Sequence, residues 1–136
     1  MNHLLDTNAC IALMKPEVNP VQTRFLAAMN RGGRFLVSSI VAFELWYGIA
    51  KSKRPQENTK RVETFFSGPL ELLPFDQEDG KIAGGIRAEL QAAGTPIGAY
   101  DLLIAGQALR HSLRLITANV SEFSCVRGLD WEDWNK

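Results

Sequence analysis

The sequence predicts an α/β protein with a mainly parallel central sheet of four to five strands flanked by helices. Short apolar segments of strand length alternate along the chain with longer segments whose apolar residues recur at helical spacing. This alternation is typical of strand–helix–strand units, which build parallel sheets. The chain has 136 residues, of which 46% are apolar, so it has material for one core and we expect a single domain over residues 1–136.

The first half of the chain contains two strand–helix units. We predict strands over residues 3–6 and 35–38 and helices over residues 7–15, 20–30 and 40–51. Pro16 ends the first helix, because a proline disfavours the helical conformation in the residue before it. Gly32 and Gly33 close the second helix, and Ser38 or Ser39 can cap the third.

The second half continues the pattern. We predict helices over residues 57–66, 76–93 and 100–111 and strands over residues 70–73 and 113–117. Asp76 is placed to cap a long helix whose first turn is acidic, which suits the helix dipole. The Gly84-Gly85 pair is expected to weaken that helix locally. Beyond residue 125 we expect a polar tail that contains two tryptophans.

Composition excludes several classes of protein. Fifteen basic and fifteen acidic residues give no net charge, so nucleic-acid binding would need a local basic patch or a metal ion. Cys10 and Cys125 have no metal-ligand spacing, and we expect both to be reduced in a cytoplasmic protein. No segment approaches the roughly 18 apolar residues of a membrane helix, and Asp6 interrupts the amino terminus too early for a signal peptide.

Most acidic residues have an ordinary structural explanation as helix caps, a solvated helix face or a polar tail, and three do not. Glu44 lies in a helix body within an apolar stretch, where burying a carboxylate costs several kcal/mol unless it is paired. Asp6 ends a strand and Asp101 opens an apolar helix. An exposed stripe for Glu44, a helix N-cap for Asp6 and a favourable first-turn charge for Asp101 are the structural alternatives.

These three acids are expected to converge, because ligand sites in open α/β sheets lie beyond the carboxyl ends of the strands. Clustered carboxylates repel one another, so a cation would have to hold them together. Without a Cys or His cluster the oxygen ligands favour Mg²⁺, with Mn²⁺ as a substitute. Such an ion takes its remaining ligands from water and substrate phosphate, which indicates phosphodiester hydrolysis.

Ordered motifs along the chain resemble those of PIN-domain nucleases, and more narrowly of VapC-type toxins of bacterial toxin–antitoxin modules. The motifs are Leu5-Asp6-Thr7-Asn8, Ser38-Ser39-x4-Glu44-Leu45, Pro96-Ile97-Gly98-x2-Asp101-x2-Ile104-Ala105, Thr117-Ala118-Asn119-x2-Glu122-Phe123 and Gly128-Leu129-x-Trp131-Glu132-Asp133-Trp134. No single motif is specific, but the ordered set spans essentially the whole chain.

The resemblance implies a PIN-like fold and a Mg²⁺- or Mn²⁺-dependent endoribonuclease. Asp6 and Asp101 would bind the metal, and Glu44 would complete the acidic cluster directly or through water. Thr7 and Asn8 resemble the supporting polar pair after the first acid. The implied substrate is structured RNA, with initiator tRNA cut in its anticodon loop as the expected target.

The same resemblance implies partners. A VapB-type antitoxin would insert a segment into the active-site groove and neutralise the toxin in a hetero-oligomer. Operator DNA would be contacted only through that antitoxin. The toxin itself is expected to be a homodimer, with no membrane association.

One position departs from the family pattern. Many PIN domains carry a fourth acid after the last strand, where this chain has Asn119. Asn119 could support a metal-bound water, or Glu122 could reach the site. We therefore expect one firmly bound ion and a second that arrives with RNA.

Two groups of residues keep alternative interpretations. The basic segment over residues 51–61 either contacts RNA phosphates or forms a solvated surface. Trp46, Tyr47 and Tyr100 are interpreted as core, dimer contacts or stacking platforms for bases. A phosphatase or nucleotide-binding protein is disfavoured because no glycine-rich phosphate loop follows the first strand. The alternative that stays open is a catalytically weakened RNA- or antitoxin-binding module.

Overall fold

The computed structural model describes residues 1–136 and contains five strands and seven helices. The strands are β1 (Asn2–Leu5), β2 (Arg34–Ser38), β3 (Glu71–Leu73), β4 (Arg114–Ile116) and β5 (Trp131–Glu132). The helices are α1 (Thr7–Met14), α2 (Pro20–Asn30), α3 (Ser39–Ala50), α4 (Pro55–Phe66), α5 (Gln77–Ala92), α6 (Ala99–Arg110) and α7 (Val120–Phe123).

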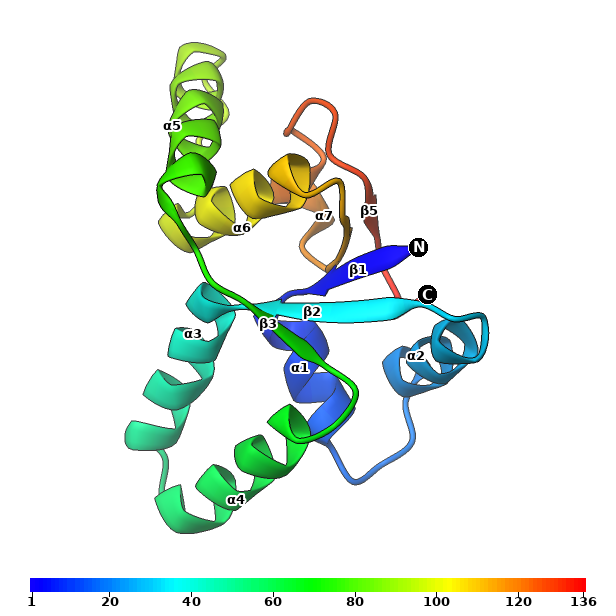
Figure 1. Ribbon diagram of the computed structural model, residues 1–136. Helices are drawn as coiled ribbons and strands as arrows, with labels where there is room; N and C mark the ends of the chain where they lie inside the picture. Colours follow the sequence, from blue (N-terminus) through cyan, green and yellow to red (C-terminus); the bar gives the residue numbers. More distant parts are fainter.

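All five strands are parallel and form one sheet in the order β3-β2-β1-β4-β5. Helices α1 to α4 lie on one side of the sheet and α5 to α7 on the other (Figure 1). From the central strand β1 the chain adds β2 and then β3 on one side. It then crosses back to β4, on the other side of β1, and adds β5 at that edge. Neighbouring strands β1 and β4 thus lead into helices on opposite sides of the sheet, and this arrangement leaves a crevice at their carboxyl ends.

The core forms between the sheet and the two helical layers. The central strands β1, β2 and β4 each contain a run of apolar residues, because helices cover both of their faces. Leu4, Leu5, Val37 and Leu115 are completely buried, and one cluster of 22 buried residues joins both sides of the sheet. The predicted α/β fold with a parallel sheet is confirmed.

The helix boundaries follow local capping. The Asp76 carboxylate accepts the backbone N–H of Asp79, whose own carboxylate accepts the N–H of Asp76, so α5 begins with a capping box. Helix α5 continues through Gly84 and Gly85, and the expected local weakening at this pair stays a prediction. Packing against α6 compensates for their low helix propensity.

Helix α6 is fixed by polar contacts as well as by apolar packing. Arg110, in its last turn, forms ion pairs with Asp76 and with the buried carboxylate of Asp79. The Gln107 side-chain amide donates to the carbonyls of Leu73 and Pro74 at 3.2 and 3.3 Å. These bonds join α6 to the start of α5 and to the end of β3, and so set the position of the whole helix.

The carboxyl-terminal region differs from the predicted polar tail. Residues 120–123 form the short helix α7, and β5 extends the sheet next to β4. Trp134 is 2% exposed and packs against the rings of His3 and Phe35. The sequence did not indicate β5, because acidic residues surround it and an edge strand needs apolar residues on one face only.

Two glycines on the paired helices α5 and α6 differ in the space around them. A methyl group on Gly106 would lie 2.9 Å from the Ala83 Cβ and 3.0 Å from the Ala83 backbone nitrogen. We therefore expect Gly106→Ala to destabilise the protein by about 1–3 kcal/mol, because the helices would have to separate. Urea unfolding monitored by circular dichroism measures this change.

Gly84→Ala is the matched control, because no atom lies within 4 Å of a methyl group there. In an exposed helix interior this change should stabilise the protein by about 0.5–1 kcal/mol. A Gly106→Ala protein as stable as the unmodified chain would contradict the close packing of α5 and α6.

Candidate active site

Asp6 lies where β1 ends, beside the end of β4. Its backbone N–H donates to the Ile116 carbonyl at 3.2 Å, and its Oδ1 accepts the Ala9 N–H at 2.8 Å as the N-cap of α1. The side chain is only 7% exposed. Burial raises the pKa of Asp6, hydrogen bonds from Thr117 and Ala9 lower it, and the charge of Glu44 raises it further. Asp6 is therefore both a helix cap and a buried acid facing other acids.

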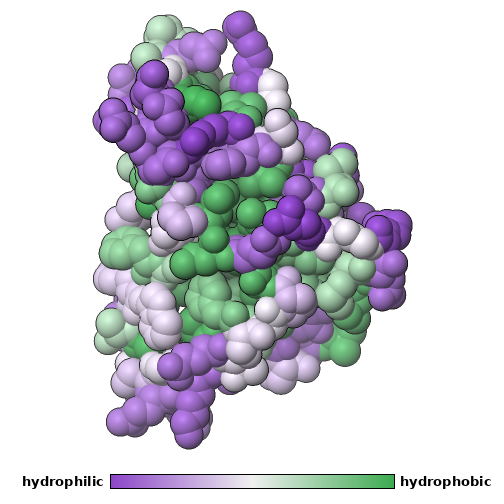
Figure 2. Space-filling model, in the orientation of Figure 1, coloured by the Kyte–Doolittle hydropathy of each residue, from purple (hydrophilic) through white to green (hydrophobic).

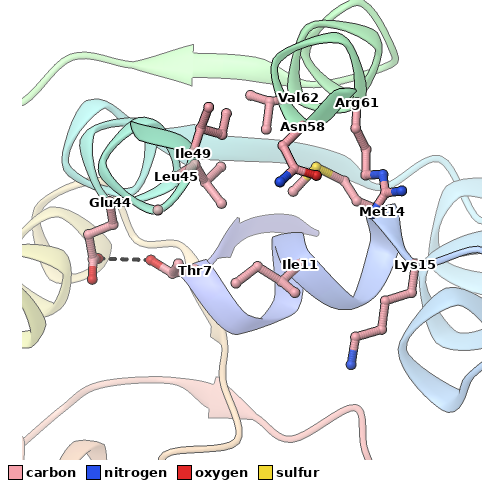
Figure 3. Close-up of a pocket in the computed structure, with 11 residues that line it drawn as sticks. Thr7, Ile11, Met14, Lys15, Glu44, Leu45, Ile49, Asn58, Arg61 and Val62 are labelled. Atoms are coloured by element: carbon pink, nitrogen blue, oxygen red, sulfur yellow. Dashed lines mark hydrogen bonds between the residues drawn. The ribbon is translucent and has the colours of Figure 1, made fainter. Parts of the chain in front are cut away.

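Glu44 lies on α3 and is held by a residue of α1. The Thr7 hydroxyl donates to Glu44 Oε1 at 2.8 Å (Figure 3). The expectation that Glu44 is buried among apolar neighbours is wrong, since the side chain is half-buried and its neighbour Phe43 is 52% exposed. The apolar sequence around Glu44 reflects an exposed aromatic surface as well as the core.

Asp101, in the first turn of α6, is joined to Glu122 through Asn119. The Asn119 side-chain amide donates to Asp101 Oδ2 at 3.1 Å and to Glu122 Oε2 at 2.7 Å. Glu122 Oε1 also accepts the backbone N–H of Gly98, which is the N-cap residue of α6. Asn119 therefore connects two carboxylates instead of supplying a further negative charge.

The acids influence one another strongly. Burial raises the pKa of Asp101 to about 7, with further increases from its hydrogen bond to Glu122 and from the charges of Glu122, Glu44 and Asp6. The same hydrogen bond from Asp101 lowers the pKa of Glu122. None of these four acids forms an ion pair with a Lys, Arg or His of the chain. The site is thus a cluster of acids without an internal counter-ion.

The donor atoms of this cluster suit a hard cation. They are carboxylate, amide and hydroxyl oxygens, with neither His nor Cys among them, which favours Mg²⁺ or Mn²⁺ over zinc. No three of the chain's His, Cys, Asp and Glu side chains form a ready ligand group. Mg²⁺ is compatible with this arrangement, because it typically binds one or two carboxylates and keeps water or phosphate oxygens as its other ligands.

Two further residues complete the description of the site. The Asn8 side chain is exposed and makes no hydrogen bond within the chain, so it is free to bind a ligand. Thr117 was not among the predicted site residues, yet it is buried, bonds to Asp6 and accepts the backbone N–H of Asn119 at 3.0 Å. A polar residue directly after an apolar strand was the signal that could have identified it.

Sequence comparison gives the class of protein. Residues 3–127 match the model of the PIN domain, which covers most of the chain. The fold described above is therefore a PIN fold, with its acids at the carboxyl ends of a five-stranded parallel sheet.

Individual relatives narrow the class further. The chain is 40% identical to the tRNA(fMet)-specific endonuclease VapC of Salmonella typhimurium over 98% of both chains. It is 34% identical to ribonuclease VapC2 of Rickettsia felis over the full length of both. It superimposes with a TM-score of 0.90 on a chain of the VapBC2 structure from Rickettsia felis, which is bound to a promoter DNA fragment, with 98% and 99% of the two chains covered at 32% identity. The chain belongs to the VapC ribonuclease toxins of the VapBC toxin–antitoxin systems.

The raised pKa of Asp101 predicts a pH-dependent stability in EDTA. The pKa of Asp101 in the folded protein, about 7, lies above its ordinary value of 3.8. Between these two pH values the Asp101 carboxyl is therefore protonated in the folded state and ionised in the unfolded state. Stability is consequently lost as the pH rises from about 4 to 7. Asp101→Asn should remove this loss and stabilise the protein at pH 8 by roughly 1–2 kcal/mol, a figure reduced for the solvent screening of a half-buried group.

Thermal unfolding of both proteins at pH 5 and pH 8 tests this expectation. The difference in melting temperature between Asp101→Asn and the unmodified chain should be larger at pH 8 than at pH 5. Equal differences at the two pH values would show that the Asp101 carboxylate is not destabilised by its neighbours.

Proposed function

We propose that this chain is a Mg²⁺- or Mn²⁺-dependent endoribonuclease that hydrolyses RNA phosphodiesters at the cluster of Asp6, Glu44 and Asp101. The observation that carries the proposal is a group of carboxylates without an internal counter-ion, in which Asn119 bridges Asp101 and Glu122 and in which burial, followed by the neighbouring acids, raises the pKa of Asp101 to about 7. A divalent cation would relieve this repulsion. The ribonuclease activity in the names of full-length relatives supports the same assignment.

Each residue of the proposed site would have a distinct role. Asp6 and Asp101 would bind the ion, and Glu44 would complete the ligand set directly or through water. Bound there, the ion would supply a Lewis acid for the phosphate and lower the pKa of a water molecule. Thr7 keeps the Glu44 carboxylate in place through its 2.8 Å hydrogen bond. The exposed amide of Asn8 would support the bound water or phosphate.

Asn119 sets the number of ions in this proposal. Its amide holds Asp101 and Glu122 together without adding negative charge. One carboxylate fewer weakens the attraction for a second cation, so we propose one firmly bound ion and a second that arrives with RNA. Glu122 lies close enough to Asp101 to share a proton, and it would become available to the second ion.

The proposed substrate is structured RNA, with initiator tRNA cut in the anticodon loop as the specific target. The support is the name of the relatives in Salmonella typhimurium and Shigella flexneri, tRNA(fMet)-specific endonucleases that are 40% and 38% identical to this chain. Both alignments cover at least 98% of each protein, so the comparison includes every residue of the acidic cluster.

The proposed partner is a VapB-type antitoxin that inserts a segment beside the acids. Solved relatives are VapBC complexes bound to DNA, and one is 40% identical to this chain. We propose that this chain reaches operator DNA only through the antitoxin, because its own net charge is zero. No helix of the chain combines the length and hydropathy that crossing a membrane requires.

A homodimer is the proposed assembly of the toxin itself. Four aromatic side chains on α3 and α6 are 41–58% exposed, so they are not core residues: Phe43, Trp46, Tyr47 and Tyr100. Phe43 and Tyr100 pack edge to face at 5.7 Å, which joins the two helices into one aromatic surface. Figure 2 shows further apolar residues across the middle of the visible face, where the edge strand β3 faces the viewer. Exposed aromatic surfaces of this kind mark interaction sites.

Substitution of the acids tests the catalytic proposal. Asp6→Asn, Glu44→Gln and Asp101→Asn should each reduce cleavage of bulk bacterial tRNA in Mg²⁺ by more than about 100-fold, the upper range for a supporting residue. Asn119→Ala should reduce it by about 10–100-fold. EDTA should abolish cleavage, and sequencing the new 5′ ends identifies the RNA and the bond.

The control is Glu57→Gln, which removes an exposed carboxylate outside the cluster and should leave cleavage unchanged. If the unmodified chain cleaves no RNA with either Mg²⁺ or Mn²⁺, the weakened binding module becomes the better description. Full activity of one acid variant would remove that residue from the site.

Light scattering after size exclusion tests the homodimer. We expect twice the 15.1 kDa chain mass for the unmodified protein and a shift towards the monomer for Phe43→Ser and Tyr47→Ser. Leu26→Ser, which alters a similarly exposed apolar residue on α2, should leave the dimer intact. A monomeric unmodified chain would contradict the proposal. Variants that stay dimeric but bind RNA less tightly would assign the aromatic surface to RNA.

A further inference from the structure

A groove leads away from the acidic cluster between α1, α3 and α4. It has a volume of about 330 Å³, begins at Thr7 and Glu44 and reaches Lys15, Asn58 and Arg61 at its far end. Figure 3 shows Arg61 extending from α4 towards the end of α1, where Lys15 lies. The floor between the two ends is apolar: Ile11, Met14, Leu45, Ile49 and Val62. The groove therefore has an acidic end and a basic end.

The two cations at the basic end are unpaired. Lys15 and Arg61 are exposed, and neither forms an ion pair with an acid of the chain. Elsewhere in the basic segment Arg54 pairs with Glu57 at 3.5 Å, and the Lys51 ammonium lies 4.8 Å from the centre of the Tyr47 ring. Arg61 thus differs from Arg54 and Lys51, which have partners within the chain. The fold also places Lys15, which is distant in sequence, at the same end of the groove as Arg61.

We propose that Lys15 and Arg61 bind backbone phosphates of the RNA strand that extends from the scissile bond along this groove. The inference rests on the ribonuclease function proposed above. A protein with no net charge and an acidic active site gains affinity for a polyanion from a bound metal ion or from local cations, and these two cations lie in the groove that opens at Glu44.

RNA is favoured over a peptide at the basic end because unpaired cations there match the regular charge of a phosphate backbone. The apolar floor offers contacts to ribose and base faces but few polar atoms that could distinguish one base from another. The groove therefore contributes affinity and the direction of the strand, whereas the choice of RNA has to come from elsewhere on the molecule.

The test measures binding of a fluorescein-labelled single-stranded oligoribonucleotide of about 15 nucleotides, within the size range of single-strand sites. Fluorescence anisotropy is recorded in Mg²⁺ at several salt concentrations. All proteins carry Glu44→Gln, so that the RNA is not cleaved during the measurement. Lys15→Gln and Arg61→Gln remove the cations, and because both residues are exposed we expect the variants to fold normally, as circular dichroism will verify.

Each substitution should weaken binding several-fold at low salt and reduce the slope of log K against log salt by about 0.7, the value for one phosphate contact with a single strand. The double variant should lose about twice that slope. Lys53→Gln is the matched control, since Lys53 is an exposed cation of the same segment that does not line the groove. Its affinity and slope should stay unchanged.

Three results would overturn the proposal. Unchanged slopes for both groove variants would exclude the phosphate contacts, and an equal effect of Lys53→Gln would indicate a diffuse field instead of a groove. If the variants lose affinity for the antitoxin but not for the oligonucleotide, the groove is a protein-docking site. Failure of the ribonuclease function itself is distinct, because the chain with Glu44 intact would then cleave no RNA.

Discussion

The parallel pairing of β1 with β4 is the constraint on which the acidic site depends. Leu5 lies opposite Ile116 in the register, so the residues that follow the two strands, Asp6 and Thr117, emerge side by side. The chain leaves β1 towards one helical layer and β4 towards the other, and the space between these departures becomes the site. Bringing carboxylates together there opposes folding, and the buried apolar strands on both sides provide the compensating stability.

The elements of the fold were largely predictable, because the burial of most strands and helices leaves a recognisable pattern of apolar residues in the sequence. The central strands carry short apolar runs, such as Leu4-Leu5 in β1 and Phe35 to Val37 in β2, and Asp76 and Pro20 mark helix starts by local chemistry. β5 was missed because an edge strand of two residues has no pattern of its own. Its stability comes from Trp134, whose packing against Phe35 joins residues about a hundred positions apart and is invisible to a local reading.

The acidic site was predictable only in outline. Sequence identified Asp6, Glu44 and Asp101 as acids without a complete structural explanation, and the charge of Glu44 raises the pKa values of both Asp6 and Asp101 in the folded chain. Glu44 is half-buried beside exposed aromatic residues and not enclosed by the core, because an apolar neighbourhood in sequence cannot distinguish the core from an exposed aromatic surface. The bridge that Asn119 makes between two carboxylates depends on side-chain directions, which only the folded chain defines.

The close contact of α5 with α6 at Gly106 affects how the two walls of the site respond to a ligand. No side chain of residue 106 separates the two helices there, so they pack backbone to backbone and have little room to shift. Arg110 and Gln107 restrain the same helix against sliding along its axis. Asp101 therefore lies on a helix whose position is fixed. Adaptation to RNA strands or protein segments of different shape falls to the opposite side of the site, where α1, α3 and α4 line an open groove with an apolar floor.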